Sequence, residues 1–484
     1  MRDYYFLHEV WAAMSEPVVL SDKVRERMQK SVDFLKDYLA RAQAPVYGIN
    51  TGFGSLQNVE ISASELNELQ ENLLITHAAG VGALLSEEIT RTMMWLKLLN
   101  MSKGYSGIRP LVFERLAYMY NNGIVPVVNE QGSLGASGDL APLSQMCLPL
   151  IGKGRVRING AILDSQDWLK SAGLTPIVLD PKEALALING TQFMMAHALV
   201  AYKKIEQIEA QLPWIAGLSI DAFDCRMEPF HPAIHDVRPH NGQIRAAAEI
   251  RQVLEGSQRA EMPKKQVQDP YSFRCIPQVH GASYDALDHC FSVWETELNA
   301  VTDNPNVFEN EDCVLSGGNF HGQPLALTLD YAAIAIAELA NISERRLYLL
   351  VSGQRDLTPY LAEIPGTDSG CMITQYSAAS LVSQNKQLCT PASVDSIMSS
   401  NGQEDHVSMG ANAATKLLRV VENTRYVLSM EWLCGAKANA QRSVTTSEGI
   451  EKRLHAFLSD GPLDHRNIPM NDLIERSYRY CWLG

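Results

Sequence analysis

A glycine-rich stretch at residues 132–139 holds the least ordinary chemistry in this chain. It reads Gly-Ser-Leu-Gly-Ala-Ser-Gly-Asp and includes the tripeptide Ala136-Ser137-Gly138. A flexible turn is the default interpretation of such a tripeptide. A phosphate-binding loop is disfavoured because no Gly-Lys-Ser/Thr follows and no alternating strands and helices surround it. A serine nucleophile elbow is also disfavoured, because Asp139 stands where G-x-S-x-G requires its last glycine.

The backbone of the tripeptide allows a fourth chemistry, which is cyclisation. In a tightly bent loop the Gly138 amide nitrogen can attack the Ala136 carbonyl carbon, since glycine has no Cβ to obstruct the bend. Loss of water closes a five-membered ring, and loss of a second water from Ser137 leaves an exocyclic methylene. The product, 4-methylidene-imidazol-5-one, is an electrophile that no standard side chain supplies. Spacing alone does not decide between this chemistry and a plain turn.

Blocks of sequence across nearly the whole chain resemble those of the aromatic amino acid lyase family. They are Tyr47-Gly-Ile-Asn-Thr-Gly-Phe-Gly54, Asn189-Gly-Thr-Gln192, Gln268-Asp-Pro-Tyr-Ser-Phe-Arg-Cys275, Thr302-Asp-Asn-Pro305, Ser316-Gly-Gly-Asn-Phe-His-Gly322 and Gln403-Glu-Asp-His-Val-Ser-Met409. The resemblance implies a carbon–nitrogen lyase that eliminates ammonia from an amino acid. It also implies that Ala136, Ser137 and Gly138 form the methylidene-imidazolone autocatalytically, and Asp139 is expected to assist ring formation.

Tyr47 is the general base that this resemblance implies. Elimination of ammonia requires a base for the weakly acidic β-hydrogen and a site that stabilises developing charge. A phenol titrates near about 10, so positive or hydrogen-bonding neighbours must lower its pKa. Gly52 and Gly54 predict an irregular loop that could close over the substrate. Taken alone, a tyrosine before a glycine-rich segment is more often structural.

Arg274 is the expected clamp for the substrate carboxylate, because a planar guanidinium matches a carboxylate in a bidentate way. An ordinary salt bridge is the alternative for this arginine. The resemblance also places Asn189, Tyr271 and Gln268 around the electrophile, with Gln268 contacting the substrate. Asn189 and Tyr271 would donate hydrogen bonds to the ring carbonyl. Phe320 is expected to form a wall of the prosthetic-group pocket, although a phenylalanine there could equally be core.

Two positions bear on which amino acid is the substrate. The pair Thr76-His77 resembles the Ser-His of histidine-specific members; phenylalanine-specific members carry a bulky apolar pair, and some tyrosine-specific members also carry His. Glu404 stands where the phenylalanine and tyrosine enzymes usually have Gln. A carboxylate pairs well with an imidazole N–H and is a costly neighbour for a phenyl ring. These residues favour histidine, unless Glu404 forms a salt bridge with Arg345 or Arg346.

Three hypotheses for function follow. The first is elimination of ammonia from L-histidine to give urocanate. The second keeps the electrophile, and the chain is a tyrosine or phenylalanine ammonia-lyase or an aminomutase that returns the amine to the β-carbon. The third is a non-catalytic helical assembly whose loop stays uncyclised.

A cluster of histidines has spacing that can indicate a metal site. It comprises His231, His235, Asp236 and His240. Pro232 and Pro239 interrupt the helix that would align these side chains. We therefore predict loop packing or subunit contacts in this segment, and no metal.

Composition disfavours nucleic-acid and membrane partners. The 484 residues are 46% hydrophobic and carry a formal net charge of −14, which repels phosphate backbones. The N-terminus lacks the features of a secretory signal. The longest apolar run, 193–202, is shorter than the roughly 20 residues that span a bilayer. Nine scattered cysteines without a CxxC pair favour reduced thiols in the cytoplasm.

The elements that must position these residues are mainly helices. Ser62 and Glu65 fit a capping box for a helix from about Ala63 to His77, and apolar residues at positions 66, 69 and 73 share a face with His77. Longer helices are expected at about 181–212, 324–351 and 407–440. One hairpin is expected at 155–163, because its central Asn-Gly favours a type I′ turn.

We therefore predict a mainly α protein. Residues 191–484 would form a long central helical bundle with C-terminal helices. Residues 1–190 would form a smaller N-terminal region that carries the catalytic tyrosine loop and the prosthetic-group loop. The family resemblance adds a homotetramer with active sites shared among subunits.

Overall fold

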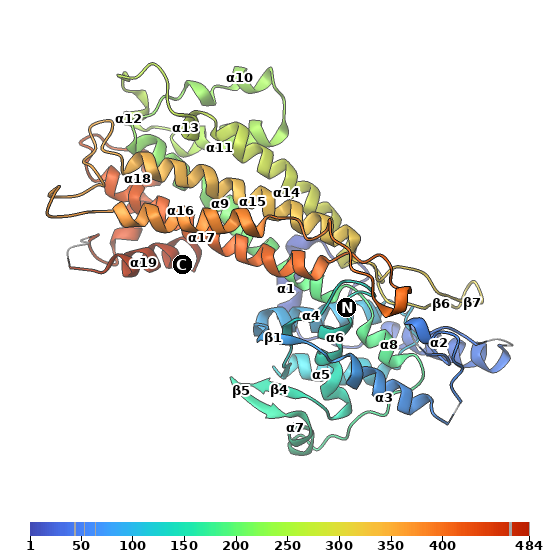
Figure 1. The fold of residues 1–484 in the computed structure, drawn as a ribbon. Coiled ribbons are helices and arrows are strands. Elements are labelled where there is room, and N and C mark those ends of the chain that lie inside the picture. Colours follow the sequence, from blue (N-terminus) through green and yellow to red (C-terminus); the bar gives the residue numbers. More distant parts are fainter. Residues whose placement is uncertain (43–44, 53, 63, 464–466, 484) are drawn as a thin grey trace. The chain divides into compact units, whose positions relative to one another are not determined.

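The structure is a computed structural model, and it describes the chain except for residues 43–44, 53, 63, 464–466 and 484. The described residues form 19 α-helices and three small antiparallel sheets (Figure 1). The predicted mainly α fold with long bundled helices is confirmed.

The chain forms two compact units, each built from three segments. The first unit comprises Met1–Val200, Phe291–Asp330 and Pro391–Thr415, and the second comprises Ala201–Cys290, Tyr331–Thr390 and Lys416–Gly484. The predicted division after residue 190 stays a prediction. All of residues 1–190 lie in the first unit, together with later segments that the sequence did not assign to it.

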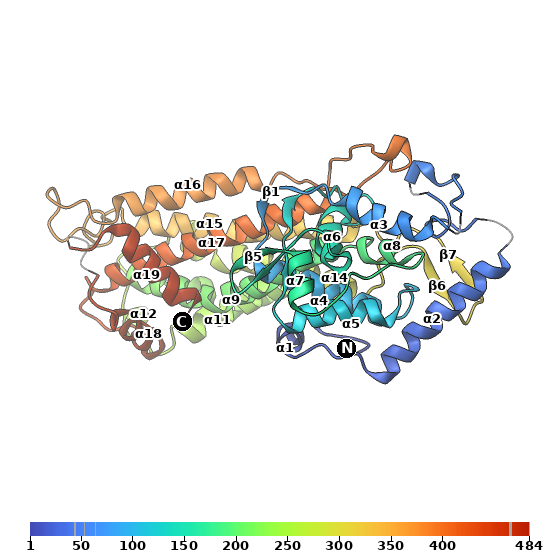
Figure 2. The same cartoon turned by 90° about the horizontal axis from the view of Figure 1, so that it is seen from below.

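Short helices and strands dominate the first unit. Its helices are α1 (Val10–Ser15), α2 (Asp22–Arg41), α3 (Leu66–His77), α4 (Glu87–Ser102), α5 (Pro110–Asn121), α6 (Leu140–Cys147), α7 (Ser165–Ser171) and α8 (Glu183–Ile188), with 3₁₀ turns η1 (Leu7–Glu9), η2 (Gly54–Leu56), η3 (Leu148–Ile151) and η5 (Ser400–Gly402). Strand β1 (Val81–Leu84) pairs with β3 (Asn129–Gln131), β4 (Arg155–Ile158) lies between β2 (Val125–Pro126) and β5 (Ala161–Asp164), and β6 (Asn306–Phe308) pairs with β7 (Cys313–Leu315). Helices α3, α6 and α8 pack against one another (Figure 2).

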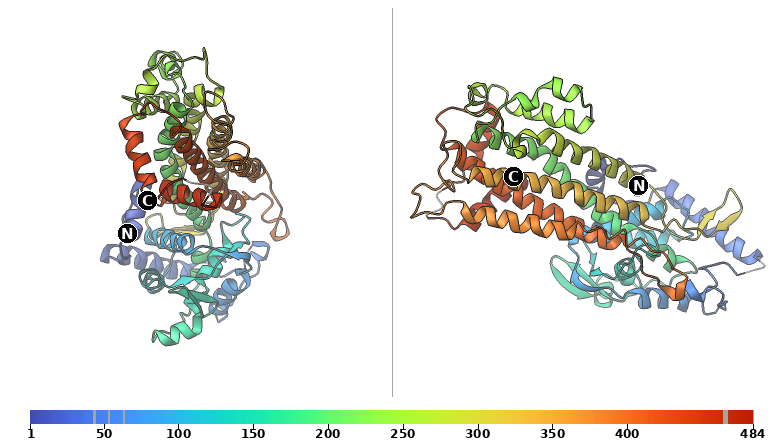
Figure 3. Two further views of the ribbon diagram at one scale, coloured as in Figure 1. Left: turned by 90° about the vertical axis from the view of Figure 1, so that its left-hand side faces the viewer. Right: turned by 45° about the horizontal axis from the view of Figure 1, so that its top comes forward.

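Long helices dominate the second unit, where they run side by side (Figure 3). They are α16 (Met372–Leu388) and the larger parts of α9 (Gln192–Ala222), α14 (Ile276–Leu298), α15 (Gln323–Leu350) and α17 (Gly410–Asn439), whose remaining residues belong to the first unit. The shorter elements are η4 (Glu228–Phe230), α10 (Pro232–Asp236), α11 (Asn241–Val253), α12 (Gln258–Glu261), α13 (Tyr271–Arg274), α18 (Glu448–Leu458) and α19 (Met470–Trp482). A buried ion pair joins Arg346 of α15 to Glu431 of α17, and Ser219 of α9 donates to the same carboxylate. The bundle therefore holds a charged network in its core that satisfies each buried partner.

The predicted helix at 63–77 corresponds to α3, which begins three residues later and ends at His77 as expected. Ala63 lies outside the described residues. The predicted capping box is wrong. The Ser62 hydroxyl donates to the Glu65 carboxylate, so that carboxylate is engaged by a side chain, and Glu65 itself has helical backbone angles at the N-cap position.

The helix predicted at 181–212 is two helices, which is a further correction. Helix α8 ends at Ile188 and α9 begins at Gln192. Gly190 between them has φ +126°, which no α-helix accommodates. The apolar pattern continues through the break because both helix ends are buried, so periodicity alone does not reveal it.

The other predicted elements are confirmed. Helices α15 and α17 match the expected ranges to within three residues at each end. Strands β4 and β5 form the expected hairpin, with Asn159 at φ +49° and Gly160 at φ +82°, as a type I′ turn requires.

Helix α15 is long and apolar enough to cross a membrane by length and composition, since its most apolar window of 18 residues has a mean hydropathy of 1.5. The run at 193–202 that the sequence singled out is part of α9 instead. In this structure 72% of the α15 window is buried, which is the burial expected for the core helix of a bundle.

Candidate active site

The Ala-Ser-Gly loop lies between β3 and α6 in a sharply bent conformation. Gly138 has φ +68°, and a Cβ there would lie 2.2 Å from the Gly190 carbonyl oxygen. The Asp139 amide donates to the same carbonyl oxygen at 2.8 Å. Only glycine therefore fits position 138, and the loop is sharply bent at this residue.

The Asn189 side chain contacts both the carbonyl oxygen and the hydroxyl of Ser137 in this loop. Its side-chain amide donates to the Ser137 carbonyl oxygen at 2.7 Å and contacts the Ser137 hydroxyl at 2.9 Å. The amide oxygen of Asn189 is buried and has no hydrogen-bond partner among the described residues. The donor set thus fits a group with a carbonyl at Ser137, and a polar atom remains for a further partner.

Asp139 is fully buried against the N-terminus of α9. Its carboxylate accepts from the amides of Phe193 and Met194, each at 3.0 Å, and from the Ser133 hydroxyl at 2.9 Å. Burial raises the pKa of Asp139 to about 7, against the opposing effect of these hydrogen bonds. The carboxyl group can therefore take up or release a proton near neutral pH.

A pocket of about 400 Å³ in the first unit brings four of the predicted residues together. It is lined by Tyr47, His77, Ser137 and Glu404. Apolar side chains of α3, α6 and α8 complete the wall, namely Leu69, Leu73, Leu140, Leu185 and Ile188. A cavity of this size, mostly apolar with a few polar groups, is typical of a small-molecule site.

Tyr47 precedes the glycine-rich turn that forms one side of the pocket. The Gly54 amide donates to the Tyr47 hydroxyl oxygen at 3.4 Å, and this contact orients the phenol toward the turn. Phe53, in the same sequence block, lies outside the described residues.

His77 ends α3 inside the pocket. Burial lowers its pKa below the ordinary value, which outweighs the opposing effects of the Leu73 carbonyl and the Glu404 carboxylate. The Thr76 hydroxyl lies 3.2 Å from His77 Nδ1 and also donates to the Asn72 carbonyl oxygen at 2.7 Å. His77 is therefore neutral at neutral pH, with a hydroxyl oxygen beside one ring nitrogen.

Glu404 accepts a hydrogen bond from the Ser399 hydroxyl at 2.7 Å. The alternative salt bridge that the sequence left open is wrong, because Arg345 pairs with Glu344 and Arg346 with Glu431. The Glu404 carboxylate has no cationic side chain within 4 Å in the described part of the chain. It is therefore available to a ligand that donates a hydrogen bond.

Tyr271, Arg274 and Gln268 belong to the second unit. The Arg274 guanidinium lies 4.5 Å from the centroid of the Tyr271 ring, and Tyr271 is 70% exposed. Gln268 and Arg274 line a cavity of about 360 Å³. Arg274 has no acidic partner among the described residues, and its Nε is buried without an acceptor, so the guanidinium has donors left for a ligand. These three residues are not part of the pocket around Ser137.

An anchor that the sequence did not reveal holds this segment. The buried Asp269 carboxylate accepts from Arg355 at 2.7 Å and from the Arg226 amide at 2.7 Å. The Phe273 ring stacks on Phe223 with centroids 4.8 Å apart. These contacts fix both flanks of Tyr271 and therefore its position relative to Arg274.

Phe320 lies half-buried in the segment that precedes α15 in the first unit. It is not among the residues that line the pocket around Ser137, so its role as a wall stays a prediction. Sequence reasoning also missed Ser408, whose hydroxyl donates to the Gly135 carbonyl oxygen at 3.2 Å, and Lys97, a buried lysine without a motif to indicate it.

The histidine cluster at 231–240 is engaged by its own neighbours. His231 caps α10 by accepting from the Ala233 amide. His235 is buried, with Nε2 at 3.1 Å from the Pro229 carbonyl oxygen and Nδ1 at 3.0 Å from the Gln243 side-chain amide. Contacts with neighbouring residues thus hold His231 and His235, and His235 lies in helix α10. The predicted choice between loop packing and subunit contacts stays a prediction.

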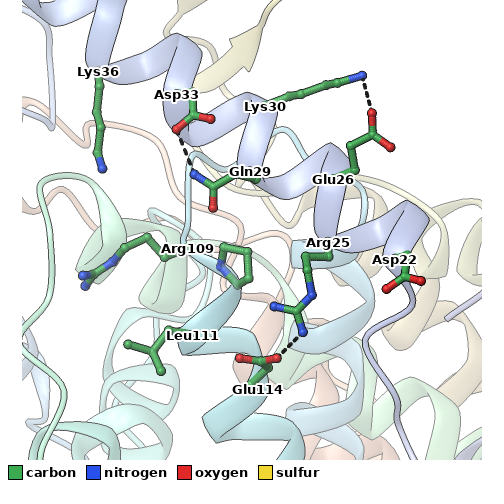
Figure 4. A pocket seen from close by; sticks show the side chains of 11 residues that line it. Asp22, Arg25, Glu26, Gln29, Lys30, Asp33, Lys36, Arg109, Leu111 and Glu114 are labelled. Atoms are coloured by element: carbon green, nitrogen blue, oxygen red, sulfur yellow. Dashed lines mark hydrogen bonds and ion pairs between the residues drawn. The ribbon is translucent and has the colours of Figure 1, made fainter.

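A larger cavity of about 870 Å³ lies between α2 and α5 (Figure 4). Its side chains pair among themselves, as Arg25 does with Glu114 and Lys30 with Glu26. None of the residues that the sequence singled out lines it, so the smaller pocket around Ser137 is the candidate active site.

Comparisons with known proteins agree with the residue pattern. The family model "Aromatic amino acid lyase" matches residues 6–459. A histidine ammonia-lyase of Geobacillus sp. (strain WCH70) is 47% identical over 442 residues, which cover 91% of this chain and 87% of that protein.

Solved structures share the fold over almost the entire chain. The histidine ammonia-lyase of Trypanosoma cruzi is 36% identical with a TM-score of 0.91, covering 99% of this chain and 92% of that one. The phenylalanine aminomutase of Pantoea agglomerans is 30% identical with a TM-score of 0.93, covering 98% and 97%. The chain belongs to the aromatic amino acid lyase family.

Proposed function

We propose that this chain is an ammonia-lyase that converts L-histidine to urocanate and ammonia. The observation that carries the proposal is the pocket in which Ser137, with Asn189 on both of its polar groups, shares one cavity with His77 and Glu404. The names of relatives at 47–49% identity support the same substrate.

We further propose that Ala136, Ser137 and Gly138 form a methylidene-imidazolone. The fit rests on the bend that only glycine allows at position 138 and on the amide donor of Asn189 at the Ser137 carbonyl. When formed, this group supplies an electrophilic carbon that takes up the substrate amine and makes it a better leaving group. No metal takes part in the proposed reaction.

Tyr47 would remove the proton from the substrate β-carbon. Its hydroxyl oxygen accepts a hydrogen bond from the Gly54 amide, and the side chain lines the pocket that contains Ser137. The neutral His77 ring and the Glu404 carboxylate would then hold the imidazole of the substrate. A neutral imidazole has one N–H for these two acceptors and an imidazolium has two. A phenyl ring has none and would leave both acceptors unpaired, at a cost of about 1–3 kcal/mol each.

Arg274 would hold the substrate carboxylate, with Tyr271 and Gln268 beside it. We propose a homotetramer in which another copy of the chain contributes these three residues to each active site, and a cytoplasmic protein whose partner is a small amino acid. The Nε–H of Arg274 supports this assignment, because it is buried without an acceptor among the described residues. Phe320 would add a wall to the prosthetic-group pocket.

An aminomutase is the second candidate, because the phenylalanine aminomutase of Pantoea agglomerans shares the fold at a TM-score of 0.93. The test is incubation of the purified protein with L-histidine, L-tyrosine and L-phenylalanine in turn. Products are separated by chromatography and ammonia is measured enzymatically. We expect equimolar ammonia and urocanate from histidine alone. Consumption of tyrosine alone, or a β-amino acid without ammonia, would overturn the proposal.

A further inference from the structure

Lys97 is a fully buried lysine that none of the proposed catalytic steps uses. It lies in α4, which is buried at every residue from 92 to 102. The ammonium group donates to the Asn189 carbonyl oxygen at 2.8 Å and to the Ala186 carbonyl oxygen at 3.2 Å. No carboxylate lies within 4 Å of it among the described residues. Burial lowers the pKa of Lys97 to about 8.

Burying an ammonium group in a protein core is energetically unfavourable. Removing an ammonium from water costs several kcal/mol, and apolar side chains of similar volume are usually tolerated better. A methionine at position 97 would fill the same space without that cost. The two carbonyl groups that Lys97 binds therefore indicate which part of the structure this unfavourable burial stabilises.

Both carbonyls lie at the C-terminal end of α8. The last carbonyls of a helix have no partner within the helix, and a cation there is favoured by the helix dipole. Lys97 thus fixes the point where α8 stops and the Asn189-Gly190 break begins. Without this donor, the buried carbonyl of Asn189 would lose its partner.

Asn189 and Gly190 form the surface against which the prosthetic-group loop is bent. The Asn189 side chain donates to the Ser137 carbonyl, and the Gly190 carbonyl accepts from the Asp139 amide. The Gly190 backbone also occupies the space that a Cβ on Gly138 would need. The dipeptide Asn189-Gly190 therefore links Lys97 to the loop.

We infer that Lys97 is a positioning residue for ring formation, which it promotes by holding the 189–190 peptide against the loop. This rests on the proposed function. In the step concerned, the Gly138 nitrogen bonds to the Ala136 carbonyl carbon. The carbonyl oxygen leaves as water with the amide hydrogens of Gly138 and Ser137, and a C=N bond forms between the Ala136 carbon and the Ser137 nitrogen. The Ser137 hydroxyl then leaves with the Ser137 α-hydrogen as a second water. No oxidant or other reactant is consumed.

The experiment compares Lys97→Met, Lys97→Gln and Lys97→Arg with the wild type by intact mass spectrometry. Lys437→Met is the matched control, since Lys437 is also buried and also donates to a backbone carbonyl, that of Leu463. Circular dichroism and gel filtration confirm that each variant is folded. Intact mass reports the two lost waters directly and does not depend on turnover.

We expect the wild type and Lys437→Met to lack two waters in nearly every chain. Folded Lys97→Met should be dehydrated in less than about a tenth of its chains, because small misplacements of reacting atoms cost large factors in rate. Lys97→Arg, which can donate to both carbonyls, should recover much of the water loss. In Lys97→Gln, which has a shorter side chain and a single amide, the loss of water should stay incomplete. This variant decides the question if Lys97→Met fails to fold.

Complete dehydration of folded Lys97→Met, or of folded Lys97→Gln, would overturn the inference and leave the proposed function intact. An encoded mass in the wild type itself would overturn both. Equal losses of dehydration in Lys437→Met and Lys97→Met would also contradict the inference, because buried lysines in general would then be responsible.

Discussion

The positions of the hydroxyl and ring hydrogens decide which polar groups of the candidate pocket donate a hydrogen bond and which accept one. The Thr76 hydroxyl has one hydrogen, which it donates to the Asn72 carbonyl oxygen. Its oxygen can then only accept from His77 Nδ1, 3.2 Å away. The proton of the neutral imidazole therefore lies on Nδ1, and Nε2 keeps a lone pair. A substrate ring with an N–H is the partner that such a lone pair prefers.

The first prediction tests this assignment with Thr76→Val, which is close in shape to threonine but lacks the hydroxyl. The variant should raise the KM for L-histidine about tenfold, the value of one hydrogen bond, and should change kcat much less. Thr76→Ser keeps the hydroxyl and should match the wild type. Steady-state kinetics of both variants decide it, and an unchanged KM in Thr76→Val would show that the hydroxyl does not orient the ring.

Among the elements, the break between α8 and α9 has the largest consequence for the site. It brings Asn189 to Ser137 and starts α9 so that its first amides reach the Asp139 carboxylate. In the second unit, the ion pair between Asp269 and Arg355 holds the segment that carries Tyr271 and Arg274. In both places a short irregular segment, fixed by buried polar contacts, holds residues of the proposed site.

A second prediction concerns Gly190→Ala. Gly190 has φ +126°, and a Cβ there would lie 2.6 Å from the Gln192 side-chain oxygen and 2.8 Å from the Thr302 hydroxyl. We expect a loss of stability of roughly 1–3 kcal/mol and a large loss of ammonia release. Gly173→Ala is the control, because Gly173 also has positive φ but nothing lies within 4 Å of its Cβ position. Thermal unfolding and ammonia release are measured for both, and equal activity in the two variants would contradict the account.

At the scale of the whole molecule, buried histidines make the fold sensitive to acid. Burial lowers the pKa of His197 to about 4, and its ring contacts the Phe193 carbonyl oxygen at 2.8 Å. Burial and the nearby Arg346 also hold the pKa of His280 well below its usual range. Asp139 acts in the opposite direction, since its raised pKa of about 7 favours the fold at low pH and disfavours it as pH rises.

The third prediction follows from the sign of the His197 shift. Between the pKa of an unfolded histidine, about 6.5, and that of folded His197, the unfolded chain binds the extra proton, so stability falls as pH falls. The total loss from this group is roughly 3 kcal/mol. His197→Asn keeps a donor near the Phe193 carbonyl without the titration. The decrease in Tm between pH 7 and pH 5 should therefore be smaller in His197→Asn, and an equal decrease would refute the assignment.

The sequence predicted the long helices α15 and α17 well, because apolar residues recur along them with helical periodicity. It did not predict the break at Asn189-Gly190, since buried helix ends on both sides continue the same apolar pattern. The residues that share the pocket were predicted from family resemblance, whereas no local pattern relates Tyr47 to Glu404. Lys97 was missed because a buried lysine carries no sequence signature.

Ammonia release from L-histidine by Ser137→Ala tests the central claim most directly. The claim is that the Ala-Ser-Gly loop makes the electrophile of the reaction, and this substitution removes the hydroxyl that must leave as water. Alanine fits the space of serine, so the folded structure should persist. We predict a rate at least roughly a thousandfold below that of the wild type. A folded Ser137→Ala that releases ammonia at the wild-type rate would contradict the account.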